Sequence, residues 1–109
     1  MLVIELLWFE DCPNYPAARD LLREVVSQRG LDTPVREIDA TDPAEAARLR
    51  FPGSPTIRVN GRDVAPAYVD PGDYTPRCRV YHTAAGVRGI PDRAWVEAAI
   101  DQALADETR

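Results

Sequence analysis

Cys12 is the residue whose type and position are best suited to chemistry. It follows an apolar run at 2–9 and precedes an amphipathic segment that begins near Pro16. The first backbone N–H groups of a helix have no partner inside the helix, and the helix dipole adds partial positive charge there. A thiolate at that end is stabilised relative to the thiol, which favours a reactive sulfur. A buried structural cysteine at the end of a strand is the alternative interpretation.

A second stretch of interest is Gly53-Ser54-Pro55-Thr56-Ile57. A peptide bond that precedes proline adopts the cis form at modest cost, whereas other peptide bonds rarely do. Pro55 has no backbone N–H, and Ser54 then offers its own N–H and C=O to an extended substrate. Such a substrate would bind as a short added strand. A simple break between a helix and a strand is the alternative role of Pro55.

The composition predicts a single globular domain, because 109 residues suffice for one core and are too few for two. No apolar run approaches the roughly 20 residues of a membrane helix. The N-terminus also lacks the basic start and cleavage site of a signal peptide. We therefore expect a cytoplasmic protein that binds no membrane. The net charge of −5 argues against nucleic-acid binding, which depends on neutralising phosphates.

The reactive side chains exclude several kinds of site. All 13 basic residues are arginines, which rules out a Schiff-base lysine and a P-loop lysine. The two cysteines, Cys12 and Cys78, are too few for a secreted disulfide scaffold or a four-cysteine zinc site. The single histidine, His82, excludes sites that need several histidines. We predict free thiols, with no metal and no cofactor.

Hydrophobic periodicity predicts the element order β-α-β-α-β-β-α. Strands are expected over 2–9, 35–39, 56–59 and 78–82, and helices over 17–29, over 44–49 and from Pro91 onward. The nearly continuous apolar run at 2–9 is typical of a central strand covered on both faces. Asn60-Gly61 is a hairpin signal, and 62–77 would form an ordered excursion before the last strand.

These elements predict one α/β domain over 1–105 and a frayed tail over 106–109. The second strand would lie beside the first through a right-handed crossover. The strands at 56–59 and 78–82 would pair as a hairpin. The result would be a four-stranded mixed sheet, flanked by helices on both faces.

The element order resembles the thioredoxin fold, with Cys-Pro-Asn-Tyr at 12–15 after the first strand and Ser-Pro-Thr at 54–56 opening the third. In that family a cis-proline opens the third strand and lies against the cysteine, and Pro55 matches that proline. Nearly the whole chain is similar to a group of small thioredoxin-like proteins, some of them labelled organomercurial (alkylmercury) lyases. The similarity also includes Gly53-Ser54-Pro55, Cys78-Arg79-Val80-Tyr81 and the Gly-x-x-Gly-x-Pro turn at 86–91.

The chain departs from thioredoxins that carry a Cys-x-x-Cys motif, because Tyr15 replaces the second cysteine. A dithiol resolves its own mixed disulfide, whereas a lone Cys12 needs another thiol. Cys78 and glutathione are the candidates for that thiol. In the expected topology Cys78 starts a strand at the end of the sheet away from Cys12. A disulfide requires Cα atoms within about 7 Å, so we expect no resting bridge.

The resemblance implies a thiol–disulfide oxidoreductase that forms mixed disulfides at Cys12 with a protein thiol or a small thiol such as glutathione. The candidate catalytic residues are Cys12, Cys78 and Asp11, and the candidate substrate contacts are Pro13, Tyr15, Ser54, Pro55 and Thr56. One alternative is an organomercurial or soft-metal binding protein, in which Cys12 and Cys78 capture mercury and Asp11 supplies a proton. Another is a redox-silent interaction domain. Asp11 could instead be a solvated loop carboxylate, and Tyr15 a packed aromatic residue.

Overall fold

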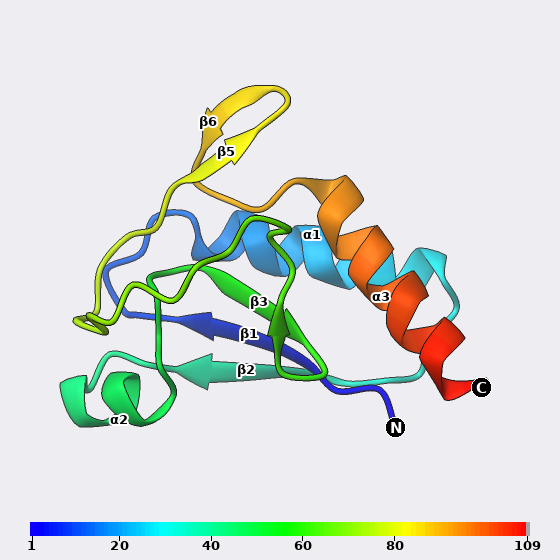
Figure 1. The fold of residues 1–109 in the computed structure, drawn as a ribbon, viewed down its shortest axis with the longest axis horizontal. Helices are drawn as coiled ribbons and strands as arrows, with labels where there is room; N and C mark the ends of the chain where they lie inside the picture. Colours follow the sequence, from blue (N-terminus) through cyan, green and yellow to red (C-terminus); the bar gives the residue numbers. More distant parts are fainter. Residues whose placement is uncertain (109) are drawn as a thin grey trace.

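Strand β1 (Ile4–Trp8) lies inside the sheet, between β2 (Val35–Asp39) and β3 (Thr56–Val59) (Figure 1). The computed structural model describes residues 1–108. The sheet order is β2-β1-β3-β4, with β1 parallel to β2 and antiparallel to β3. The sheet is therefore four-stranded and mixed, as predicted, and the apolar run of β1 occupies an interior position.

Three helices accompany the sheet in residues 1–108: α1 (Tyr15–Gln28), α2 (Pro43–Arg48) and α3 (Arg93–Glu107). Each begins within two residues of a proline that the sequence places near its first turn. The side chains of Asp42 and Asp92 accept hydrogen bonds from backbone N–H groups at the starts of α2 and α3. The three predicted helices are thus present, with small differences at their ends.

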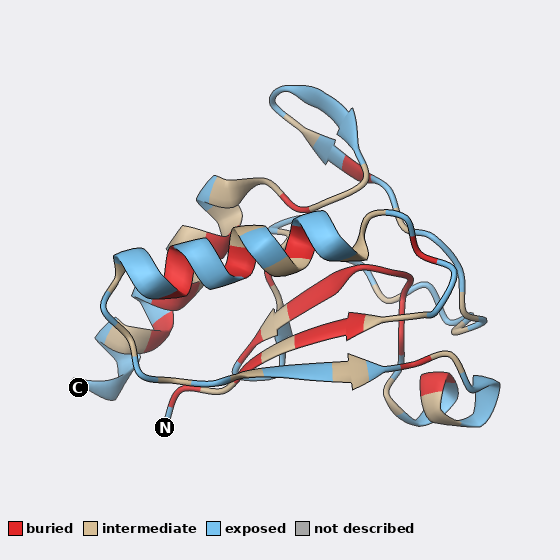
Figure 2. Ribbon diagram, turned by 180° about the vertical axis from the view of Figure 1, so that it is seen from behind, coloured by how far each residue is buried: buried red, intermediate tan, exposed pale blue. Residues whose placement is uncertain are grey.

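The buried side chains form two apolar clusters that share β1. Ile4 and Leu6 pack with residues of α1 and α3 in one cluster, and Leu7 packs with Ala46 and Phe51 in the other. Side chains alternate along a strand, so Leu6 and Leu7 point to opposite faces of the sheet. Figure 2 shows the buried positions gathered on β1, β3 and the side of α1 that faces them.

The predicted fourth strand at 78–82 is wrong, because another segment takes its place in the sheet. The Asn60-Gly61 turn folds the chain back directly, and β4 (Arg62–Asp63) pairs with the free edge of β3. Only the end of the predicted segment is a strand, β5 (Tyr81–Thr83). It pairs with β6 (Gly86–Arg88) in a separate two-stranded sheet that projects from the domain in Figure 1.

Helix α3 includes Asp106 and Glu107, which the sequence placed in a frayed tail, and Arg109 lies outside the described residues.

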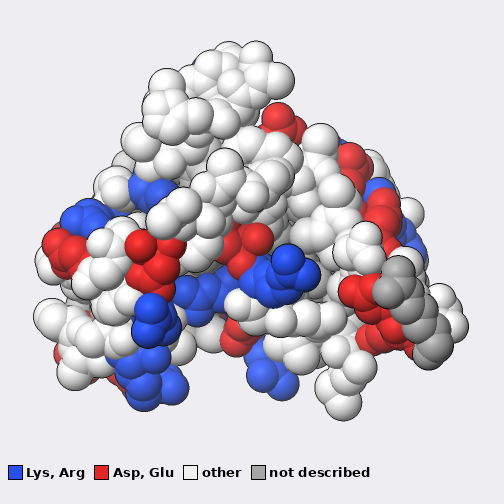
Figure 3. All heavy atoms as spheres, in the orientation of Figure 1, with Lys and Arg blue, Asp and Glu red and all other residues white. Residues whose placement is uncertain are grey.

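Acidic and basic side chains lie beside one another over much of the face in Figure 3. Within residues 1–108, none of the helices has the length and apolarity needed to cross a membrane.

Replacing Phe51 with alanine should lower the free energy of unfolding by about 3–5 kcal/mol, because this fully buried ring would leave a cavity beside Leu7. Urea unfolding monitored by circular dichroism measures the change. Val69→Ala is the control, since Val69 is 81% exposed; it should alter the same free energy by less than about 0.5 kcal/mol. Equal effects of the two substitutions would contradict this description of the core.

Candidate functional site

Cys12 lies in the turn that joins β1 to α1. Its backbone N–H donates to the Phe9 carbonyl at 3.1 Å, which closes the turn, and Asn14 is the N-cap residue of α1. Among the side chains that the structure describes, none hydrogen-bonds the N-terminus of α1 as a cap. The Cys12 side chain is 8% exposed, so it is largely covered while lying close to the helix start.

The amide of Asn14 is used for packing instead of capping. It lies against Gly89, where a Cβ atom would come within 2.2 Å of the Asn14 Nδ2 atom. A larger residue at position 89 would therefore have to displace Asn14. The segment that follows β6 therefore packs against the N-cap residue of α1.

The other residues predicted around Cys12 have mixed placements. Asp11 and Pro13 are exposed beside the turn. The Tyr15 ring stacks on Trp8, with ring centroids 4.5 Å apart, and its hydroxyl donates to Glu37. That hydrogen bond is the main cause that raises the pKa of Tyr15. In this structure Tyr15 is thus packed against another aromatic ring, which is one of the two roles considered for it from the sequence.

The predicted Ser54-Pro55-Thr56 stretch is buried and lies beside the Cys12 turn. The Ser54 hydroxyl accepts a hydrogen bond from the Phe9 N–H at 3.3 Å, and the Ser54–Pro55 peptide bond is cis. The Pro55 carbonyl accepts a hydrogen bond from the Tyr81 hydroxyl. Segments that are distant in the sequence therefore converge on this short stretch.

Residues 77–79, which we call the strap, occupy the backbone groups of Ser54. The Ser54 N–H donates to the Arg77 carbonyl at 2.7 Å, and the Arg79 N–H donates to the Ser54 carbonyl at 2.9 Å. These two bonds pair Ser54 with Cys78 in a short parallel bridge. In this structure the chain itself therefore fills the position beside Ser54 that the sequence analysis assigned to a substrate.

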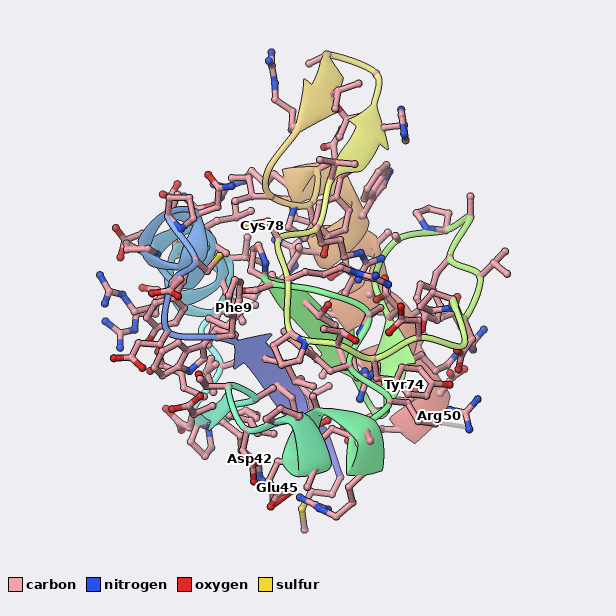
Figure 4. All side chains as sticks on the ribbon, turned by 90° about the vertical axis from the view of Figure 1, so that its left-hand side faces the viewer. Phe9, Asp42, Glu45, Arg50, Tyr74 and Cys78 are labelled. Carbon is pink, nitrogen blue, oxygen red and sulfur yellow. The ribbon has the colours of Figure 1, made fainter. Side chains whose placement is uncertain are left out.

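Cys78 accordingly lies beside Ser54 and not at the far end of the sheet, where the expected topology placed it. The reason is that β4 occupies the edge of β3, which leaves the segment around Cys78 free to cross the start of that strand. Figure 4 shows Cys78 and Phe9 on the same side of the domain, and Ser54 contacts both segments. Both cysteines are free thiols, Cys12 buried and Cys78 exposed.

A close backbone approach at Gly53 makes the strap possible. Gly53 has φ +127°, a conformation that side-chain-bearing residues rarely adopt. A Cβ atom there would lie 2.9 Å from the Cβ of Arg79. Glycine is thus required at this position for the strap to lie flat on the loop.

Arg79 anchors the strap through a buried ion pair. Its guanidinium donates to both oxygens of Asp63, at 2.6 and 3.1 Å, and to the Thr56 hydroxyl at 3.0 Å. The side chains of Arg79 and Asp63 are 11% and 3% exposed. The guanidinium also lies 4.3 Å from the ring centroid of Tyr81 and 5.2 Å from that of Tyr68. The sequence analysis missed this pair, because no local pattern links two residues that meet only after folding.

The preceding excursion is anchored by a second arginine. Arg50 donates to Asp70 at 2.6 Å and lies 5.4 Å from the ring centroid of Tyr74, whose hydroxyl also donates to Asp70 (Figure 4). The hydrogen bonds from Tyr74 and the Gly72 N–H, followed by that from Arg50, lower the pKa of Asp70 to about 2. Specific contacts therefore hold the segment before the strap, whereas residues 62–63 of the predicted excursion form β4 instead.

A groove lies beside the strap, and neither Cys12 nor Cys78 lines it. The groove has a volume of about 510 Å³ and is lined by Tyr68, Arg79, Tyr81 and Trp95 among others. In the part of the chain that the structure describes, His, Cys, Asp and Glu side chains form no group of three suited to a metal ion. No protein-family model, curated protein or solved structure matches this chain.

Replacing Asp63 with asparagine should lower the free energy of unfolding by about 3 kcal/mol, because Arg79 would be left buried without its counter-charge. The asparagine oxygen still accepts from the Ala65 N–H, so the local turn is kept. Adding Arg79→Met should restore part of the loss. Urea unfolding measures both variants.

Asp73→Asn is the matched control for this pair. Asp73 pairs with Arg77 at the surface, where the two side chains are 61% and 44% exposed. The substitution should therefore leave the unfolding midpoint almost unchanged. If Asp63→Asn were as harmless as Asp73→Asn, the buried pair would not anchor the strap.

Proposed function

We propose that this protein is a thiol–disulfide oxidoreductase with a thioredoxin-like fold and that Cys12 is its reactive thiol. The observation that carries the proposal is the position of Cys12 between the end of β1 and the start of α1, beside the Ser54-Pro55 loop. The sheet order β2-β1-β3-β4, with a parallel β1–β2 pair, supports the fold. The fold alone would leave the reaction open, so the proposal rests on the site.

The proposed reaction begins when the Cys12 thiolate attacks one sulfur of a substrate disulfide. A bond forms between Cys12 and that sulfur, and the other sulfur leaves as a thiolate. The N–H groups in the first turn of α1 would stabilise the Cys12 thiolate, since the described side chains leave them uncapped. A second thiol then releases the bound substrate. The partner would be a protein thiol or a small thiol such as glutathione, in a cytoplasmic setting.

The exposed fraction of Cys12 favours small disulfides as first substrates. With 8% of its surface exposed, Cys12 offers little area to a folded protein, whereas a flexible disulfide needs only a narrow approach. Asp11 and Pro13 lie exposed beside the turn and would border that approach.

Alkylation of single-thiol variants tests the proposed activation of Cys12. In Cys78→Ser the only thiol is Cys12, and its reaction rate with iodoacetamide at about pH 6.5 should remain a substantial fraction of its own rate at about pH 9.5. Cys12→Ser gives the profile of Cys78 for comparison; the rate of an ordinary free thiol falls about tenfold for each pH unit below about 8.5. Because the rates of one variant are compared at two pH values, the different burial of the two thiols does not affect the comparison. The same steep fall for Cys12 would contradict the proposal.

Soft-metal capture is a second candidate function, favoured by the position of both thiols on segments that contact Ser54. Two thiolates provide a suitable donor set for mercury, which would be the substrate. Titration with Hg²⁺, which can bind two thiolates at once, should then show one tightly held metal per chain in the parent protein. Either single serine substitution should weaken the binding strongly. Equal binding by the parent and the single-thiol variants would reject cooperation between the thiols.

A further inference from the structure

The strap fills the place that the proposed function assigns to a substrate strand. An extended substrate beside Ser54 would use the N–H and C=O of that residue. Arg77 and Arg79 already use both, at 2.7 and 2.9 Å, and the residue between them is Cys78. The chain therefore presents a cysteine of its own at the position where the sulfur-bearing residue of a substrate would lie.

The position of Cys78 is fixed on both sides. Arg77 is bound through its carbonyl, and Arg79 is bound through its N–H and through the buried pair with Asp63. Gly53 leaves room for Arg79 to lie directly over the loop. Cys78 nevertheless remains an exposed residue, although its backbone neighbours are fixed.

The turn that carries Cys12 also contacts Ser54, on a different side from the strap. The Cys12 N–H binds the Phe9 carbonyl, and the Phe9 N–H binds the Ser54 hydroxyl. Burial is the main cause that raises the pKa of Tyr81, and Cys12 adds a smaller electrostatic contribution. The Tyr81 hydroxyl donates to the Pro55 carbonyl. Ser54 and Pro55 thus lie between the segments that carry the two thiols.

We infer that Cys78 is the resolving thiol of Cys12, held for that role by the pairing of the strap with Ser54. The inference rests on the proposed function. The Cys78 thiolate attacks the Cys12 sulfur of the mixed disulfide, a Cys12–Cys78 bond forms, and the substrate leaves as a thiolate that takes up a proton. The chain loses two electrons, and the substrate disulfide gains them. Two molecules of a small thiol such as glutathione then reduce the Cys12–Cys78 bond and leave as their own disulfide, which returns the chain to its dithiol form.

Oxidation of the full chain with glutathione disulfide, followed by acid quenching and intact mass measurement, tests the inference. The parent protein should end with an intrachain disulfide. Its glutathione adduct should stay below about one tenth of that in Cys78→Ser, because a thiol on the same chain has a high effective concentration. Peptide mapping should place the adduct of Cys78→Ser on Cys12.

A double variant, Cys78→Ser with Val80→Cys, is the matched control. It keeps two thiols and puts the second at a position that is 62% exposed, two residues beyond the pairing with Ser54. It should accumulate the adduct on Cys12 as Cys78→Ser does. Intrachain closure as fast as in the parent would overturn the role of the strap.

The remaining outcomes separate this inference from the proposed function. A lasting glutathione adduct on Cys12 of the parent protein, with Cys78 free, would overturn the inference and leave Cys12 as the reactive thiol. Failure of Cys78→Ser to form any adduct at Cys12 would overturn both. Circular dichroism of each variant confirms that the comparison is made between folded proteins.

Discussion

The pairing of Ser54 with the strap is the interaction on which the site depends. Ser54 is fully buried, and buried backbone N–H and C=O groups must find partners or cost about 1–3 kcal/mol each. Arg77 and Arg79 supply those partners. A substrate that binds as an added strand would need the same two groups. The strap and such a substrate therefore compete for one position, and the fold is stable with the strap in it.

The surrounding residues explain why this segment of the chain fills the position. Gly53 has no Cβ atom, so nothing there blocks the approach of the strap. The Asp63–Arg79 pair fixes the end of the strap. A buried ion pair is weak evidence for stability, because desolvation opposes the attraction of the charges. Its role here is geometric. With Arg79 held between two tyrosine rings and Asp63, the register of the strap on Ser54 is defined.

Local patterns in the sequence predicted the parts of the fold that depend on local physics. The apolar period at 17–29 and the alternation at 35–39 correspond to α1 and β2, and Asn60-Gly61 makes the hairpin of β3 and β4. The segment at 78–82 has a strand-like alternation, but whether it joins the sheet depends on which segment takes the edge of β3. The contacts of Tyr15 likewise depend on Glu37, a partner supplied by another strand.

The two hydrogen bonds to Ser54 are one part of what keeps the strap in place, beside the buried pair of Arg79 and Asp63. A hydrogen bond contributes about 0.5–1.5 kcal/mol net, so the two bonds to Ser54 amount to about 1–3 kcal/mol. Local openings of this size are far less costly than global unfolding. A substrate strand that supplies the same two bonds would return most of that cost. If Cys12 acts as proposed, a small disulfide would reach it with the strap in place, whereas an extended peptide would first have to displace the strap from Ser54.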